Sequence, residues 1–254
     1  MNAIIRANGE VWNAIAPIRN GQPPEFYVDG GSALEPVEIE LAGDVRGKTV
    51  LHLACSTGDE AISWAMLGAV AFGIDISQVH VAKAIAKAAA VGATCDFRCA
   101  DMFDLPADLH DIDLIYISWG GVNWAPDIDA WARIIAGRLN SGGAILISEM
   151  HPLWFALSVT GDNALTVRAD YFENAGIPTT WDATKEPDGG RESDGPVLRS
   201  FVRSLGSMVT ALLNAGLRID ALEEHPDASN YAGLGPAAAA IPAVYYLKAT
   251  RPLG

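Results

Sequence analysis

The segment TVLHLACSTGDEAISWA, residues 49–65, decides the fold class of this chain. It begins with a mostly apolar run of strand length over 49–53, passes through a turn of small residues over 54–58, and enters a helix-forming segment at Asp59. A short apolar run that leads through a tight turn into a helix is typical of a βαβ unit, whose parallel strands are buried on both faces. The segment therefore predicts an α/β fold built on parallel strands.

The alternation of apolar runs and helices continues to Glu149 and resumes near the C-terminus. The further predicted strands are 70–76, 94–99, 114–118, 144–148, 218–224 and 244–248, and the predicted helices are 59–67, 77–90, 127–139 and 204–215. Ser77 is expected to cap the second of these helices, residues 140–143 to end the third, and Gly216 to end the last. We predict a doubly wound, Rossmann-like, mostly parallel seven-stranded sheet with helices on both faces.

The chain is predicted to form a single domain over residues 1–254. Its parts are an N-terminal helical cap (1–45), a ligand-binding core (48–150), a long insertion after the fifth strand (151–202), and a C-terminal helix with two strands (203–254). The insertion contains TKEPDGGRESDGP (184–196), which is almost entirely charged residues, glycine and proline and therefore indicates a loop. We expect the cap and the insertion to form the substrate pocket and its lid, because such segments set specificity.

The amino-acid composition limits the kinds of molecule that this chain is expected to bind. The 254 residues include 17 Lys and Arg against 31 Asp and Glu, which gives a formal net charge of −14. Nucleic acids and anionic membranes attract basic surfaces, so we expect neither as a partner. No run approaches the ~20 apolar residues of a membrane span, and the first six residues lack the apolar stretch of a secretory signal. We therefore expect a cytoplasmic protein, and its three cysteines are too few for a disulfide framework or a zinc site.

Candidate ligand-binding residues follow the predicted strands, because ligands of open parallel sheets bind beyond the carboxyl ends of the strands. The small residues of 54–58 would let the backbone approach a ligand closely. Asp75 lies 22 residues beyond Leu53, at the spacing of the acid that holds ribose hydroxyls. Asp101 and Met102 suit the amine and the ring face of an adenine. The predicted nucleotide-binding residues are Ala54, Cys55, Ser56, Thr57, Gly58, Asp75, Ile76, Asp101, Met102, Phe103, Ser118, Trp119 and Gly120.

Two of these acids have plainer interpretations, which the sequence leaves open. Asp75 could cap the helix that Ser77 begins, and Asp101 could be an ordinary loop acid. Cys55 is expected to be a small buried residue in the turn rather than a nucleophile, since no His or Cys partner is near it in the sequence.

The order and spacing of these segments resemble the class I S-adenosylmethionine (SAM)-dependent methyltransferases, in particular a bacterial small-molecule group with the first motif HLxCxxG. The matching segments are LHLACSTGDEAISWA (51–65), GIDIS (73–77), FRCADMFDLP (97–106), SWGGVNW (118–124), LNSGGAILISEMHP (139–152) and, more weakly, SLGSMVTALLNAGLRID (204–220). The resemblance implies SAM as cofactor, S-adenosylhomocysteine (SAH) as product and no metal. It also implies methyl transfer to a nitrogen or oxygen of a small-molecule substrate by in-line SN2 displacement.

The chain departs from the wider methyltransferase pattern at two places. That pattern has an acid and three glycines in the first motif, where this chain has His52, Ala54, Ser56 and Gly58. Related sequences often carry a histidine where this chain has Arg203, so no base is carried over from that position.

A general base is needed only if the acceptor arrives protonated. The candidate catalytic residues are His151 and Tyr171, with Glu149 and His225 as further candidate bases. His151 directly follows the fifth strand, although it could simply shape the turn before Pro152.

Four tryptophans, Trp12, Trp119, Trp124 and Trp154, are candidates for substrate contact, with core packing as the alternative. Asp162, Asp170 and Glu173 in the insertion would favour an amine-bearing or cationic substrate, and therefore N-methylation. The oligomeric state is left open.

Two other functions remain alternatives. A SAM-binding module without turnover would accord with the altered first motif. An NAD(P)-dependent oxidoreductase would need GxGxxG, where residues 54–59 read ACSTGD. Adenine-N6 methylation of nucleic acid is disfavoured because residues 118–121 read SWGG in place of [DN]PP[YFW].

Overall fold

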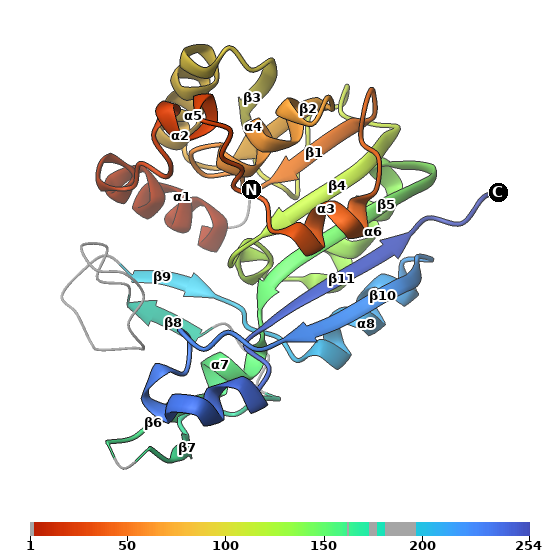
Figure 1. Ribbon diagram of the computed structural model, residues 1–254. Helices are drawn as coiled ribbons and strands as arrows, with labels where there is room; N and C mark the ends of the chain where they lie inside the picture. The colour runs from red at the N-terminus through yellow and green to blue at the C-terminus, as the bar shows by residue number, and fades with distance from the viewer. Residues whose placement is uncertain (1–2, 162, 173–176, 181–196) are drawn as a thin grey trace.

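The structure is a computed structural model that describes residues 3–161, 163–172, 177–180 and 197–254 (Figure 1). Its central sheet has seven strands in the order β10-β11-β5-β4-β1-β2-β3. The strands are β1 (Thr49–Leu53), β2 (Val70–Asp75), β3 (Cys95–Cys99), β4 (Ile112–Ser118), β5 (Leu139–Met150), β10 (Arg218–His225) and β11 (Val244–Thr250). All neighbours from β5 to β3 pair in parallel, whereas β11 runs antiparallel to both β5 and β10. The predicted doubly wound, mostly parallel sheet is confirmed.

Alternate residues of the central strands face opposite layers of helices. Leu51 and Leu53 of β1 belong to a core that includes Trp131 on α6 (Ile128–Arg138) and Leu212 on α8 (Leu205–Asn214). Val50 belongs instead to a core with Trp64 on α4 (Asp59–Met66) and with residues of α3 (Pro36–Ala42). Since successive side chains of a strand point to opposite faces, α6 and α8 cover one face, and α3 and α4 cover the other.

Polar caps explain where two of the core helices begin. The Ser77 hydroxyl accepts the His80 N–H at 3.2 Å at the start of α5 (Gln78–Val91), and the Asp127 carboxylate accepts the Ala130 N–H at 2.8 Å at the start of α6. At the other end of the last helix, Gly216 has a φ of 85°, a left-handed conformation that glycine adopts without strain. The predicted cap at Ser77 and the predicted stop at Gly216 are both confirmed.

The helix predicted to end before residues 140–143 does end there, since α6 stops at Arg138, but the following strand begins at Leu139 and not at 144 as predicted. Leu139 pairs with Ile112, and the next paired residues are Ala144 and Leu114, so residues 140–143 form an irregularity inside the strand. These four residues are typical of a turn, and their composition alone does not distinguish a bulge within a strand from a loop before it.

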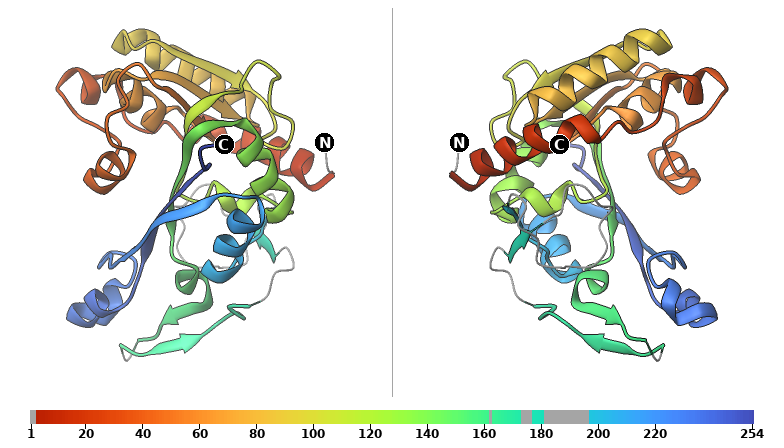
Figure 2. Two further views of the ribbon diagram at one scale, coloured as in Figure 1. Left: turned by 90° about the vertical axis from the view of Figure 1, so that its right-hand side faces the viewer. Right: turned by 90° about the vertical axis from the view of Figure 1, so that its left-hand side faces the viewer.

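The insertion and the C-terminal part contain structure that the sequence did not indicate. The insertion carries α7 (Pro152–Ala156), a hairpin of β6 (Leu157–Val159) and β7 (Leu165–Val167), and a hairpin of β8 (Ile177–Thr180) and β9 (Val197–Ser200). A 3-10 segment, η3 (Ala232–Ala240), joins β10 to β11. Figure 2 shows the β6–β7 hairpin and η3 at the end of the molecule farthest from α5. The predicted loop 184–196 lies outside the described residues.

The N-terminal cap lies beyond the carboxyl ends of the central strands. It consists of α1 (Ala3–Ile15), η1 (Ala16–Ile18) and α2 (Pro24–Val28), followed by α3. In Figure 1, α1 and the β8–β9 hairpin lie side by side beyond the arrowheads of β1 and β4, and α1 packs on β9. In the part of the chain that the structure describes, no helix has the length and apolar character needed to cross a membrane.

Candidate functional site

The turn after β1 holds its backbone in an unusual conformation. Ala54, Ser56 and Gly58 have φ values of 52°, 48° and 81°. At Gly58 a Cβ would lie 2.7 Å from the Phe97 ring and 2.8 Å from the Ala84 Cβ, so only glycine fits there. Left-handed backbone at a non-glycine residue is strained and is often found at ligand-binding sites. Gly58, the one glycine of the usual pattern that is present in this chain, therefore lies where the surrounding side chains leave no room for a Cβ.

Cys55 in this turn and His52 in β1 before it are packing residues. The Cys55 side chain is buried, and burial raises the pKa of its thiol well above the usual range. His52 is also buried, and desolvation lowers the pKa of its imidazole to about 3, which keeps the ring neutral. Its Nε2 lies 3.4 Å from the Ser118 Oγ, which links β1 to β4.

Asp75 joins the β1 turn to α5. Its Oδ2 accepts the Ser56 N–H at 2.8 Å, and its Oδ1 accepts the Ser77 N–H at 2.8 Å. The residue is 7% exposed, and His80 Nδ1 lies 3.7 Å from Oδ1. The carboxylate therefore does support the start of α5, as the plainer interpretation holds. A carboxylate has about four acceptor positions, so further donors such as ribose hydroxyls can still bind to it.

Asp101 lies just beyond β3. It is buried, and its Oδ1 accepts the Phe103 N–H at 2.9 Å. This bond uses one of the two carboxylate oxygens, and Oδ2 has no donor among the residues that the structure describes. Met102 and Phe103 are half-buried and pack on the α6–α8 core. A free carboxylate oxygen beside apolar side chains fits an adenine amine and its ring.

The loop after β4 is held by Glu149 of the neighbouring strand. Glu149 is 2% exposed, and its two carboxylate oxygens accept the N–H groups of Gly120 at 2.5 Å and Val122 at 2.9 Å. Burial raises the pKa of this carboxyl to about 7, although the backbone N–H groups act in the opposite direction. In the same loop, Trp119 has a φ of 46° and is 43% exposed. Glu149 therefore fixes the conformation of this loop.

The two predicted catalytic residues already have hydrogen-bond partners. His151 Nδ1 accepts the Leu153 N–H at 3.1 Å at the start of α7, so its Nε2 carries the proton and donates to Glu224 Oε1 at 2.9 Å. Burial lowers the pKa of His151, and Glu224 opposes that shift. The Tyr171 hydroxyl accepts the Leu205 N–H at 3.3 Å. His225, a further candidate base, pairs with Glu223 at 3.0 Å.

The four tryptophans do not form one cluster. Trp12 on α1 packs edge-on against Trp124 with ring centroids 5.3 Å apart, close to the loop after β4. Trp154 packs instead with Phe155 and against the core that contains Tyr231. Trp119 has an exposed side chain. Trp12 and Trp124 are the two that meet over the carboxyl edge of the sheet.

The acids expected to favour a cationic substrate are only partly described. Asp170 is exposed and accepts the Phe172 N–H at 2.8 Å. Asp162 and Glu173 lie outside the described residues. Within the described ranges, no group of three or more His, Cys, Asp and Glu side chains could hold a metal ion.

Two asparagines of α1 that the sequence did not single out fasten this helix over the site. Asn13 Oδ1 accepts the Ser77 Oγ–H at 2.9 Å and the Val79 N–H at 3.3 Å. The Asn8 side chain donates to the Arg199 carbonyl and accepts the Arg199 N–H, both at 2.9 Å. Between them, a Cβ on Gly9 would lie 2.9 Å from Ile76 Cγ1. In the sequence, these asparagines are visible only as polar residues of an amphipathic helix, and that pattern does not identify their hydrogen-bond partners.

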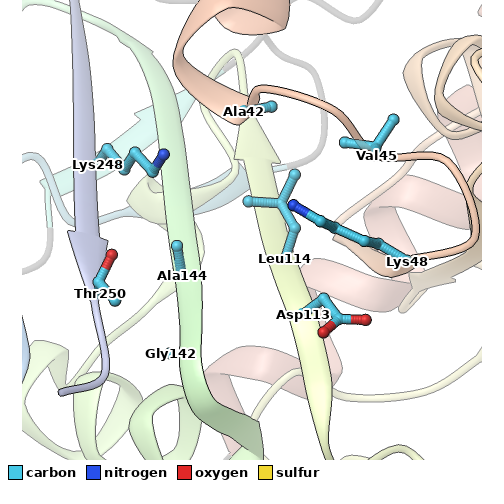
Figure 3. A pocket seen from close by; sticks show the side chains of 9 residues that line it. All are labelled: Ala42, Val45, Lys48, Asp113, Leu114, Gly142, Ala144, Lys248 and Thr250. Carbon is cyan, nitrogen blue, oxygen red and sulfur yellow. The ribbon is translucent and has the colours of Figure 1, made fainter. Parts of the chain in front are cut away.

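A pocket of about 100 Å³ lies at the opposite edge of the sheet and is not part of this site (Figure 3). It is lined by Asp113 at the start of β4, Ala144 of β5 and Thr250 at the end of β11, with the Lys48 and Lys248 side chains beside them. Ligands of doubly wound sheets bind at the carboxyl edge. All the predicted nucleotide-binding residues lie at that edge.

Comparison with known proteins finds methyltransferases that are similar to part of this chain. Residues 50–143 match the methyltransferase domain family. A protein of uncharacterised function from Mycobacterium tuberculosis is 32% identical over 122 residues, 48% of this chain and 44% of that protein. A ubiquinone biosynthesis O-methyltransferase from Xanthomonas euvesicatoria pv. vesicatoria is 30% identical over 134 residues, 51% of this chain and 56% of that enzyme. The chain thus spans about half the length of the curated relatives it matches.

The solved structures share the fold over most of the chain. An S-adenosylmethionine-dependent methyltransferase from Mesorhizobium loti superposes with a TM-score of 0.66 at 23% identity, covering 88% of this chain and 100% of that one. At this identity the likeness shows a common fold.

Proposed function

We propose that this chain, a class I methyltransferase by its fold and by the methyltransferase domain at residues 50–143, transfers the methyl group of SAM to a nitrogen or oxygen of a small molecule. The observation that carries the proposal is the convergence of three features on one edge of the sheet. These are the left-handed turn after β1, the buried Asp75 at the end of β2, and Asp101 after β3, whose Oδ2 has no donor among the described residues.

The residues at this edge fit SAM. The backbone of 54–58 would face the amino acid part, Asp75 would accept the ribose hydroxyls, and Asp101 would accept the adenine amine beside Met102. The post-β4 residues 118–120 would complete the site. When bound, SAM supplies a methyl group that its sulfonium already activates.

The chain's own contribution is mainly positioning and exclusion of water. Helix α1 covers Ile76 and Ser77, and Glu149 fixes the loop that faces the acceptor. Holding two reactants at short range can supply much of the rate acceleration. His151 and Tyr171 remain the candidate bases, and His151 could accept a proton only after its Nδ1 releases the Leu153 N–H.

Replacing Asn13 with alanine is expected to speed both binding and release of SAH about tenfold. The change removes two hydrogen bonds that hold α1 over the site, each contributing roughly 0.5–1.5 kcal/mol. Since Trp12 lies on α1, stopped-flow tryptophan fluorescence measures both rates. Asn140→Ala, which removes a bond to Asp113 at the far edge, should leave the rates unchanged. Equal rates in wild type and Asn13→Ala would show that α1 need not open.

The function itself is tested by incubating the protein with radiolabelled SAM and an extract of small metabolites from the source organism, followed by mass spectrometry of the labelled product. A labelled small molecule is the expected result. Calorimetry with SAM and with NAD(H) is the companion measurement, and binding of NAD(H) instead of SAM would overturn the proposal. Tight SAM binding with no labelled product would instead identify a SAM-binding module without turnover.

A further inference from the structure

A second, narrower pocket lies beside the loop after β4, at the carboxyl end of β5. Its lining comes from η2 (Val122–Trp124), the end of β5, α7, the start of β11 and the segment between β9 and α8. The polar lining residues are Asn123, Glu149, Arg203 and Tyr245. The free volume in this structure is about 10 Å³, roughly that of one water molecule. A pocket of this size suits the end group of a larger molecule.

Arg203 enters this pocket with unused donor capacity. It is 9% exposed, and its Nη2 donates to the carbonyl oxygens of Ala125 at 2.9 Å and Pro126 at 2.8 Å. Its Nε is buried and has no hydrogen-bond acceptor among the residues that the structure describes. Leaving a buried charged donor unsatisfied costs roughly 1–3 kcal/mol or more. The buried Nε–H therefore lowers the stability of the free protein, and a ligand that accepts a hydrogen bond from it would remove this cost.

The charge of Arg203 also has no close counterion in the described part of the chain. Among the described residues no carboxylate oxygen lies within 4 Å of its guanidinium, although the chain carries a net charge of −14. Burial lowers the pKa of Arg203, and the more distant Asp127 and Asp129 oppose that shift only in part. Glu149 lines the same pocket, but both its oxygens already accept backbone N–H groups. An anionic group of a ligand would satisfy both the charge and the free Nε–H.

We propose that Arg203 determines acceptor specificity by binding a carboxylate group of the methyl acceptor in this pocket. The inference rests on the proposed function and specifies its substrate class: a small carboxylic acid that carries the nitrogen or oxygen to be methylated. It differs from the expectation of an amine-bearing or cationic substrate, which rests on acids of the insertion and stays a prediction. The pocket adjoins the loop that completes the proposed SAM site, so an acid held by Arg203 would place its other end toward the methyl group.

The test observes the Arg203 side chain directly. In the SAH-saturated, 15N-labelled protein, the buried Nε–H of Arg203 is identified as the arginine side-chain NMR signal that is missing from Arg203→Lys. Benzoate is then titrated against benzyl alcohol, which has the same ring without the charge. We expect benzoate alone to shift the Arg203 signal, and Arg203→Lys to weaken benzoate binding at least tenfold. Equal shifts with both probes, or no shift with benzoate up to ~50 mM, would overturn the proposal.

The matched control is Arg138→Lys. Arg138 also donates to backbone carbonyls, those of Leu105, Pro106 and Leu109, but it lies on α6 away from the pocket. Benzoate affinity in this variant should equal that of the wild type. If Arg203→Lys unfolds, Arg203→Gln provides the same comparison, and the Arg138 variant shows whether loss of a carbonyl clamp alone reduces binding.

Two further measurements show whether Arg203 binds the acceptor or the cofactor, and whether a negative result refutes this inference or the proposed function. The Arg203→Lys variant should bind SAH and methylthioadenosine, which lacks the amino acid part, as tightly as the wild type does. Selective loss of SAH affinity would assign Arg203 to the carboxylate of the cofactor and overturn the acceptor proposal. Failure of the wild type to bind SAH at all would instead refute the proposed function. Inorganic phosphate is titrated alongside, and preference for phosphate over benzoate would also contradict the proposal.

Discussion

Asp75→Ala is expected to weaken SAM binding about 100-fold or more. In the proposed complex this carboxylate accepts the ribose hydroxyls, and hydrogen bonds to a charged group contribute roughly 1.5–3 kcal/mol each, so losing two corresponds to at least about a hundredfold. The same carboxylate also holds the Ser56 and Ser77 N–H groups, so the change loosens the turn that faces the cofactor. Isothermal titration calorimetry with SAM measures the effect directly.

The control for Asp75 must separate binding from helix capping. Asp127 accepts the Ala130 N–H at the start of α6, so Asp127→Ala removes a helix cap without touching the proposed site. This variant should lose stability of about 1 kcal/mol and keep its SAM affinity. An Asp75→Ala protein that stays folded and binds SAM as the wild type does would show that Asp75 only supports α5. The assignment of the cofactor to the end of β2 would then be wrong.

The sheet was predictable from sequence because its signals are local. Most central strands contain a short apolar run, and α5 and α6 start at the polar caps Ser77 and Asp127. The positions of Asp75 and Asp101 then followed from where the strands end. Parallel strands place their carboxyl ends along one edge, so residues that follow separate strands were expected to lie together, and they do.

The cover of the site could not be predicted because its contacts join distant parts of the chain. Asn13 binds residues more than sixty positions away, and Asn8 pairs with Arg199 across 191 positions. Pattern reasoning finds the apolar face of a helix, not the partner of a polar side chain on it. The same limit applies to Arg203. The sequence shows it only as a departure from a family pattern, whereas the structure shows that its buried Nε–H has no acceptor among the described residues.

Glu149 is expected to make the stability of the protein fall as pH rises from about 4.5 to 7. Its pKa is raised by burial from 4.5 to about 7 in the folded state, so in this interval the folded protein binds more protons than the unfolded chain. Rising pH therefore favours unfolding. The stabilisation from this group is complete below pH 4.5 and is lost as pH passes through 7. At 1.36 kcal/mol for each pKa unit, the loss amounts to about 3 kcal/mol.

Glu149→Gln isolates this contribution because glutamine stays neutral at every pH. Its amide oxygen can accept only one of the two N–H groups of Gly120 and Val122 cleanly, so the variant should be less stable than the wild type at pH 5. Urea unfolding followed by tryptophan fluorescence at pH 5, 6, 7 and 8 should show the difference in unfolding free energy shrinking as pH rises. Glu10→Gln, at an exposed position on α1, should give a curve parallel to the wild type. If the Glu149→Gln curve is parallel as well, the carboxyl is already ionised at pH 5 and holds the loop as a fixed anion.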